Sequence, residues 1–305
     1  MKTLVIALGG NALIKEGQKG TAEEQLENLK TPLSQIVKLY GKYRILITHG
    51  NGPQVGNILL QQESTPEVPS LPLEFCVAQS QGLIGYMIEV TLDNEFMRAG
   101  IEHPLLVTVL TYTKVDKNDP AFKNPTKPIG PYYTEEEAKK LPYKMVKTPR
   151  GYRRVVASPK PQYIVETREI KSLLDLGAIV VACGGGGIPV IKEHKTFEGV
   201  EAVIDKDLAT ARLASDIEAD ILLILTNVDK VYLNYGKDDQ MGIDRMTLEE
   251  AKKYLREGQF PEGSMGPKIE ASINFLESGG EKAIIAHIND LLKALDGKAG
   301  TQIVP

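Results

Sequence analysis

Glycine-rich turns follow three short apolar runs in this chain, and their composition suits the binding of an anion. The three turns span residues 9–11, 50–52 and 184–187. Glycine lets backbone N–H groups come close to an anion, and the N-terminus of a following helix adds the positive end of its dipole. One such turn would be weak support. Three turns of this kind in one chain predict a floor that binds phosphate groups.

Isolated lysines beside turn residues could neutralise charge on such a phosphate. Lys206 stands next to Asp207 in an expected helix over 201–215, on the side away from the apolar positions. Lys268 follows a glycine- and proline-containing loop, in the first turn of the next expected helix, where a bound anion would offset its conflict with the helix dipole. Phosphoryl transfer needs positioning and charge neutralisation rather than a covalent catalyst. Lysines and glycine N–H groups together meet that need.

Familiar nucleotide and metal motifs are missing from the sequence. There is no G-x-x-x-x-G-K-[ST] pattern, which excludes a P-loop. Gly50, Gly52 and Gly56 come close to a dinucleotide fingerprint, but the proline-rich stretch 64–72 follows where a second strand should be, which disfavours NAD. The four histidines are scattered and offer no metal-binding set, so no metal ligands are assigned, and His49 is interpreted as structural.

The elements that must position these residues alternate between strands and helices. Apolar runs predict strands at 2–8, 43–48, 104–110, 177–183, 220–226 and 282–286. Helical patterns cover about 22–40, 72–100, 165–176, 201–215, 247–257, 266–278 and 289–295. The first of these helices opens with a capping box of Thr21 and Glu24, and Pro32 inside it is expected to kink or break it. The alternation predicts an α/β fold with a mostly parallel sheet covered on both faces, with ligands at the carboxyl ends of its strands.

Residues 112–162 interrupt this alternation. The stretch is rich in Pro, Lys, Arg and Tyr and is too long for a plain connection, so it predicts a lid or small subdomain. Lys127 lies in it, between Pro125 and Pro128. A solvated surface insertion is the alternative interpretation.

Composition limits the classes of function. The formal net charge of −4 gives no overall attraction to nucleic acid or anionic lipid, so any anion site must be local. The apolar runs are too short to span a membrane, and the first strand starts too early to leave room for a leader peptide. Cys76 and Cys183 form no metal or redox spacing and are expected in the core. These features predict a cytoplasmic protein.

The sequence motifs of this chain, taken in order, resemble those of the carbamate kinases of the amino-acid kinase family. They lie at 7–12, 48–56, 80–82, 124–128, 184–187, 202–207 and 263–268, so the resemblance covers essentially the whole chain. It implies an open αβα sandwich with a small protruding lid, which forms a homodimer. An N-terminal lobe of about residues 1–200 would hold carbamate. A C-terminal lobe of about 201–305 would hold ATP or ADP with Mg²⁺.

The resemblance also implies roles for individual residues in the reaction ATP + carbamate ⇌ ADP + carbamoyl phosphate. Lys127, Lys206 and Lys268 would act on the phosphates and the carbamoyl group, with Asp207 orienting Lys206 and Lys268. The phosphate-binding residues would be Gly9, Gly10, Asn11, Gly184 and Gly185, and the carbamate pocket would be lined by Gly50, Asn51 and Gly52. The nucleotide would contact Thr226, Asn227, Val228, Tyr232, Met265, Gly266 and Pro267.

Two alternatives stay open from the sequence. One is another kinase of the same fold, acting on acetylglutamate, aspartate or a uridylate, each of which needs a dedicated pocket. The other is a nucleotide-sensing module without catalysis, which explains the glycine turns but not the separated lysines. The sequence does not determine whether the reaction would make ATP, for instance during arginine breakdown, or supply carbamoyl phosphate.

Overall fold

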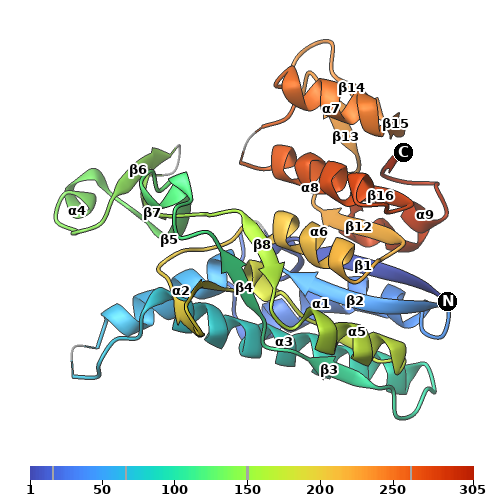
Figure 1. The fold of residues 1–305 in the computed structure, drawn as a ribbon, viewed down its shortest axis with the longest axis horizontal. Helices are drawn as coiled ribbons and strands as arrows, with labels where there is room; N and C mark the ends of the chain where they lie inside the picture. The colour runs from blue at the N-terminus through green and yellow to red at the C-terminus, as the bar shows by residue number, and fades with distance from the viewer. Residues whose placement is uncertain (16, 66, 149–150, 262) are drawn as a thin grey trace.

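The computed structural model describes residues 1–15, 17–65, 67–148, 151–261 and 263–305. Its centre is an eight-stranded sheet with the order β15-β17-β16-β12-β1-β2-β9-β3 (Figure 1). Neighbouring strands in this sheet are parallel, except for the antiparallel pair β16 and β17. The strands are β1 (Lys2–Leu8), β2 (Tyr43–His49), β3 (Leu106–Thr108), β9 (Ile179–Val181), β12 (Ile221–Thr226), β15 (Arg245–Thr247), β16 (Lys282–His287) and β17 (Thr301–Val304).

Apolar side chains of β1 alternate between two buried faces of this sheet. Val5 and Ala7 pack in the core beneath α5, α6, α7 and α8, whereas Leu4 and Ile6 pack in the core beneath α1, α3 and α9. These helices are α1 (Ala22–Val37), α3 (Leu73–Arg98), α5 (Thr167–Asp175), α6 (Lys206–Asp216), α7 (Leu248–Arg256), α8 (Met265–Glu277) and α9 (Leu291–Leu295). The predicted sandwich with a mostly parallel sheet is confirmed, and all six predicted strands lie in the sheet.

The helix α1 shows how a local signal and tertiary packing combine. Thr21 and Glu24 form the predicted capping box at its start. The sequence predicts a kink or a break of this helix at Pro32. A break is wrong, because the helix continues through Pro32, which is buried. Burial of Leu29 and Leu33 against the sheet outweighs the cost of an interior proline, which is on the order of 3 kcal/mol.

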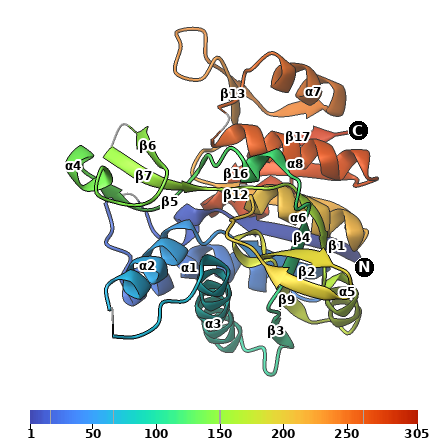
Figure 2. The same ribbon diagram turned by 60° about the vertical axis from the view of Figure 1, so that its left-hand side comes forward.

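A second sheet and a protruding subdomain occupy the segment that breaks the strand–helix alternation. Within residues 112–162, β4 (Tyr112–Val115) and β8 (Pro161–Ile164) pair with each other in a four-stranded sheet that continues through β10 (Ile188–Glu193) and β11 (Thr196–Gly199). Between them, β5 (Lys127–Tyr133), β7 (Gly151–Val156), β6 (Met145–Thr148) and α4 (Glu135–Ala138) project from the body (Figures 1 and 2). We call the described residues of 127–156 the protruding subdomain.

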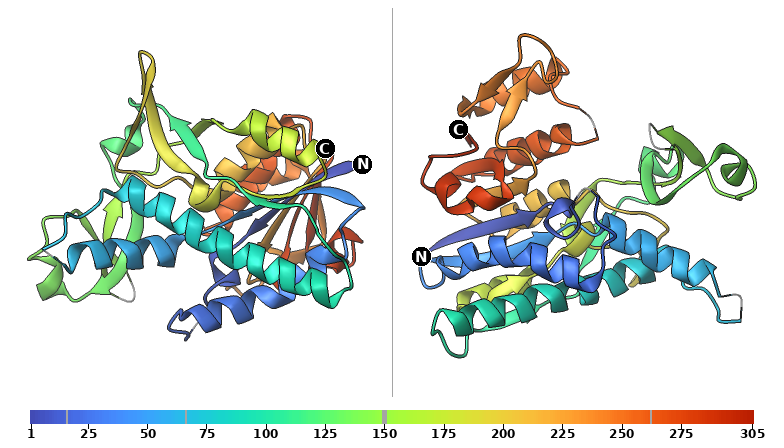
Figure 3. Two further views of the ribbon diagram at one scale, coloured as in Figure 1. Left: turned by 90° about the horizontal axis from the view of Figure 1, so that it is seen from below. Right: turned by 180° about the vertical axis from the view of Figure 1, so that it is seen from behind.

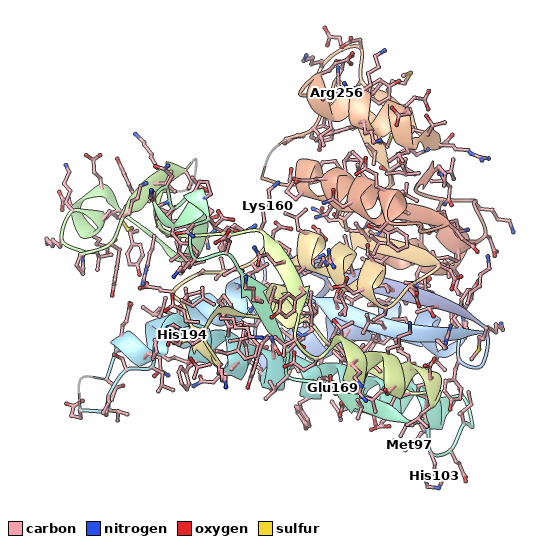
Figure 4. The ribbon with its side chains drawn as sticks, in the orientation of Figure 1. Met97, His103, Lys160, Glu169, His194 and Arg256 are labelled. Atoms are coloured by element: carbon pink, nitrogen blue, oxygen red, sulfur yellow. The ribbon has the colours of Figure 1, made fainter. Side chains whose placement is uncertain are left out.

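The protruding subdomain rests on α2 (Gly52–Glu63), which the helical patterns of the sequence did not include. At the other end of the molecule, β13 (Val231–Leu233) and β14 (Met241–Ile243) form a hairpin beside α7 (Figure 1). Lys160 lies between β8 and α8 (Figure 4), and its ammonium pairs with Glu270 of α8 at 3.0 Å. No helix in the described part of the chain is both long enough and apolar enough to cross a membrane.

Candidate active site

A cavity of about 420 Å³ lies where β1 and β12 end. It is lined by Gly9 and Gly10 after β1 and by the residues 225–228 at the end of β12. The chain leaves β1 towards β2 but leaves β12 towards β16, in opposite directions along the sheet. Parallel sheets bind ligands at such a switch point, beyond the carboxyl ends of the strands. The far wall is largely apolar and aromatic and includes Tyr232, Tyr235, Phe260 and Met265.

A second cavity of about 240 Å³ lies beside the first, at the ends of β1, β2 and β9. Gly10, Ser264 and Lys268 line both cavities, so the two meet at the end of β1. The second cavity also carries the 50–52 turn and Gly185 on its walls. A donor in one cavity and an acceptor in the other would therefore face each other across Gly10 and Lys268.

The 184–187 turn requires glycine for two reasons. Its backbone conformation is strained for other residues, and its neighbours leave no room for a side chain. Gly185 has φ +64°, and a Cβ atom at this position would stand 2.1 Å from Nδ2 of Asn51. The buried amide of Gln81 holds the turn from behind, since its Nε2 donates to the carbonyls of Gly184 and Thr111 at 3.1 and 3.2 Å. The turn and Asn51 therefore form one packed wall of the second cavity.

Asp207 joins two lysines that come from different helices. Lys206 of α6 donates to Oδ1 of Asp207 at 2.5 Å, and Lys268 of α8 donates to Oδ2 at 2.9 Å. The three side chains are nearly buried, with 11%, 16% and 6% exposure for Lys206, Lys268 and Asp207. The cluster carries one net positive charge and lines the second cavity, so it suits an anion.

Protonation in this cluster follows from burial and charge. Burial raises the pKa of Asp207, but the ammonium groups of Lys206 and Lys268 outweigh it and hold that pKa well below the usual range. Burial lowers the pKa of Lys206, and the charge of Asp207 opposes this change. The carboxylate is therefore ionised wherever the protein is folded near neutral pH.

The helix that carries Lys206 starts later than the sequence pattern indicated. The predicted helix over 201–215 begins only at Lys206, because Asp205 is its N-cap and accepts hydrogen bonds from the N–H groups of Asp207 and Leu208. Lys206 is therefore in the first turn of the helix, and it lines the second cavity. The start of the helix is corrected by the structure, whereas the position of Lys206 away from the apolar side chains agrees with the sequence expectation.

Lys127 reaches the same cavity from the protruding subdomain. It is the first residue of β5, and its ammonium donates to Oδ2 of Asp205 at 2.9 Å. Its side chain is 39% exposed, so it borders the opening of the cavity. The two residues are 78 positions apart in the sequence.

His49 lies behind the 50–52 turn and is fully buried. Its Nδ1 is 3.2 Å from the carbonyl oxygen of Gly50, and its ring packs against Gly184. Burial lowers the pKa of His49 to about 4, and the nearby charge of Lys206 adds to this effect. His49 is therefore neutral at physiological pH, and it packs between the 50–52 turn and the 184–187 turn. This agrees with the structural role expected from the sequence. Cys76 and Cys183 are both buried, as expected.

The predicted site residues divide between the two cavities. The first cavity is lined by Gly9, Gly10, Thr226, Asn227, Val228, Tyr232, Met265 and Lys268. The second is lined by Gly10, Gly50, Asn51, Gly52, Lys127, Gly185, Lys206, Asp207, Pro267 and Lys268. Gly184 and Gly266 are not among the described residues that line either cavity, because Gly184 is buried in its turn and Gly266 in the first turn of α8. Asn11 is in the short helix η1 (Gly10–Ala12), and the position of its side chain is not among the described features.

Sequence reasoning missed several residues of the cavities. Asp205, Ser264 and Ile129 line the second cavity, and Tyr235 and Phe260 line the first. Asp205 had a local signal, since an aspartate directly before a helix is a preferred N-cap. Tyr235 and Phe260 had none, because only the packing of the segment between β12 and α8 brings them both to the first cavity.

The carboxylates of the second cavity are the residues to consider as ligands of a metal ion. Asp205 and Asp207 already accept hydrogen bonds from lysines. Among the described residues, no group of three or more His, Cys, Asp or Glu side chains is arranged to hold a metal ion. Mg²⁺ commonly keeps several waters and binds through substrate phosphates. The donor set therefore suits an ion that enters with a nucleotide rather than one caged by protein.

Comparisons with known proteins decide the family. The model of the amino acid kinase family matches residues 2–287. The chain belongs to the amino acid kinase family. Curated relatives include the carbamate kinase of Thermococcus kodakarensis, 51% identical, and that of Pyrococcus furiosus, 50% identical, each matched over 100% of this chain and 99% of the relative.

A solved structure extends the comparison to the fold of this amino acid kinase. The carbamate kinase of Giardia lamblia bound to AMP-PNP aligns with a TM-score of 0.93 and 44% identity, over 99% of this chain and 98% of that one. The predicted resemblance to the carbamate kinases and the predicted amino-acid kinase fold are confirmed, and so is the prediction of a phosphotransferase. The division into lobes at about residue 200 stays a prediction.

Proposed function

We propose that this chain catalyses ATP + carbamate ⇌ ADP + carbamoyl phosphate. The observation that carries the proposal is the meeting of two cavities at Gly10 and Lys268, with Lys206 and Asp207 at the junction. The larger cavity has an apolar, aromatic wall that suits a nucleotide base. The smaller one has glycine N–H groups and lysines that suit a small anion. The similarity to carbamate kinases over the full chain supports the same assignment.

The reaction is a direct transfer between the two cavities. In the ATP-forming direction a β-phosphate oxygen of ADP attacks phosphorus, the bond from phosphorus to the carbamoyl oxygen breaks, and carbamate leaves with that electron pair. At the transition state the phosphoryl group lies between donor and acceptor, with negative charge spread over its three equatorial oxygens. Lys206 and Lys268 neutralise it there, and Asp207 keeps the two ammonium groups apart at fixed positions.

Backbone groups and the subdomain lysine complete the site. Gly9 and Gly10 line the junction, where the N–H of Gly10 would bind the phosphoryl group together with the N–H groups of Gly184 and Gly185. The N–H of Gly9 donates to the carbonyl of Leu225, so Gly9 shapes the turn rather than donating to the ligand. Gly50, Asn51 and Gly52 line the carbamate pocket, and the backbone donors come from Asn51 and Gly52, because the N–H of Gly50 already donates to the carbonyl of Leu8. Lys127 covers the carbamoyl end of the ligand. Carbamate is a small planar anion, and the second cavity of about 240 Å³ holds it together with the phosphoryl group.

The nucleotide occupies the first cavity. The turn after β12, Thr226 to Val228, faces the nucleotide, and Tyr232 and Met265 pack on the base. Gly266 and Pro267 lie in the first turn of α8, which also carries the Lys268 that reaches the β- and γ-phosphates. Mg²⁺ that enters with the nucleotide would supply further charge neutralisation.

A coupled assay of ATP formation from ADP and carbamoyl phosphate tests this function directly. We expect ATP formation from carbamoyl phosphate. We expect none from acetylglutamyl phosphate, and no conversion of UMP to UDP. Activity on an acetylglutamate or uridylate substrate without activity on carbamoyl phosphate contradicts the substrate assignment. Nucleotide binding by titration without any transfer supports the sensing module instead.

We also propose that the chain forms a homodimer through the outer face of α3. Helical spacing places Phe75, Leu83, Tyr86 and Met97 on one face of this helix, and they are 52%, 41%, 65% and 66% exposed. The helix runs along the outside of the molecule (Figure 3). An apolar stripe of this length suits a second copy of the chain. Sedimentation should give a dimer, and Tyr86→Glu should give a monomer. A dimeric Tyr86→Glu variant contradicts this surface.

A further inference from the structure

Asp205 lines the second cavity but has no part in the transfer reaction proposed for this site. Its side chain is 16% exposed and makes hydrogen bonds in two directions. Oδ1 accepts from the backbone N–H groups of Asp207 and Leu208 at 2.9 and 3.3 Å, which caps α6. Oδ2 accepts from the ammonium of Lys127 at 2.9 Å. One carboxylate thus joins a helix of the body to the protruding subdomain.

The two contacts connect opposite walls of the same cavity. The cap fixes the first turn of α6, which carries Lys206 and Asp207. The ion pair holds the long side chain of Lys127 in one conformation. Without it, this side chain would be free to adopt several rotamers. An ammonium has three N–H donors, and the bond to Asp205 uses one. The other two remain for an anion in the cavity.

We propose that Asp205 is a positioning residue that holds Lys127 over the second cavity. The proposal rests on the proposed function, because it names the group that orients Lys127 towards carbamoyl phosphate. The carboxylate also repels a bound dianion, which acts in the opposite direction. Both of its oxygens are already engaged by donors, so the orientation of Lys127 is the larger effect on ligand binding.

The variant Asp205→Asn separates the two contacts. Asparagine caps a helix about as well as aspartate, so its oxygen is used at the N-terminus of α6. Its NH₂ group then faces the ammonium of Lys127, donor against donor, and the pair is lost. The thermal unfolding midpoint and the KM for ADP should stay unchanged. The KM for carbamoyl phosphate should rise roughly tenfold, as expected for the loss of one charge-assisted contact.

A double-mutant cycle gives the decisive readout. Lys127→Ala should raise the KM for carbamoyl phosphate strongly in the parent protein but much less in the Asp205→Asn background, because Lys127 is already misplaced there. Glu193→Gln is the matched control, since it frees Lys117 from an ion pair of 2.6 Å outside the cavities. It should leave every kinetic constant unchanged. Additive effects in the cycle, or a lower KM in Asp205→Asn, overturn the proposal.

Failure of the proposed function gives a different result. A parent protein without ATP formation contradicts the function itself. In that case limited proteolysis of the unliganded protein decides the role of Asp205. The protruding subdomain should be cleaved faster in Asp205→Asn than in the parent or in Glu193→Gln. Equal cleavage rates overturn the proposal.

Discussion

The backbone of Gly56 in α2 lies directly against the backbone of Gly130 in β5. A Cβ atom at position 56 would stand 2.8 Å from the Cα of Gly130, closer than such atoms approach in proteins. The helix α2 begins at Gly52 of the glycine turn, and β5 begins at Lys127. The contact therefore sets the spacing between two walls of the second cavity.

Gly56→Ala should push the protruding subdomain away from α2, because two backbones cannot yield as a flexible side chain can. We expect a higher KM for carbamoyl phosphate, with little change in the KM for ADP. Glu193→Gln is the control, since the ion pair between Glu193 and Lys117 lies outside the cavities. Steady-state kinetics of both variants check this, and equal KM values in the two variants contradict it.

Lys268→Ala should reduce kcat by about 10²–10³-fold, the usual effect of removing one donor that stabilises transition-state charge. Nucleotide binding should weaken much less, because the loss is greatest when charge develops on the transferring group. Lys160→Ala removes a lysine that pairs with α8 outside the cavities, and it should behave like the parent. A kcat within a few-fold of the parent in Lys268→Ala would show that this lysine is not catalytic.

His49 should make the protein less stable in mild acid. Its pKa is about 4 when folded and 6.5 when unfolded, so between these values the unfolded state binds the extra proton and stability falls as pH falls. From about pH 7 to about pH 5 this loss is ~2 kcal/mol. Denaturant unfolding at both pH values should show that loss in the parent and not in His49→Asn. Equal pH dependence in the two proteins contradicts a buried neutral histidine.

ATP formation should stop in excess chelator and return when Mg²⁺ is added, because the cavities supply lysines rather than free carboxylates and the ion must come with the nucleotide. Binding of carbamoyl phosphate alone, measured by calorimetry, should persist in the chelator. Full turnover without a divalent ion would contradict the magnesium requirement.

The sequence determined the layers of the fold and the end of the sheet at which the site lies. Runs such as Leu4 to Leu8 are apolar on both faces, which marks a buried parallel strand, and the glycines that follow mark its exit. The capping box at Thr21 is equally local. These signals depend on neighbours within a few residues, so one sequence is enough to find them.

Only the tertiary structure decided which charges meet and which way they point. Lys206 lines the second cavity from the first turn of α6, where it meets Asp207 and Lys268. Lys268 and Asp207 are 61 residues apart, and Lys127 and Asp205 are 78 apart, yet each pair is 2.9 Å apart in space. Such contacts follow from how α6, α8 and the protruding subdomain pack together. Packing sums small contributions over the whole chain, and no local spacing in the sequence records that sum.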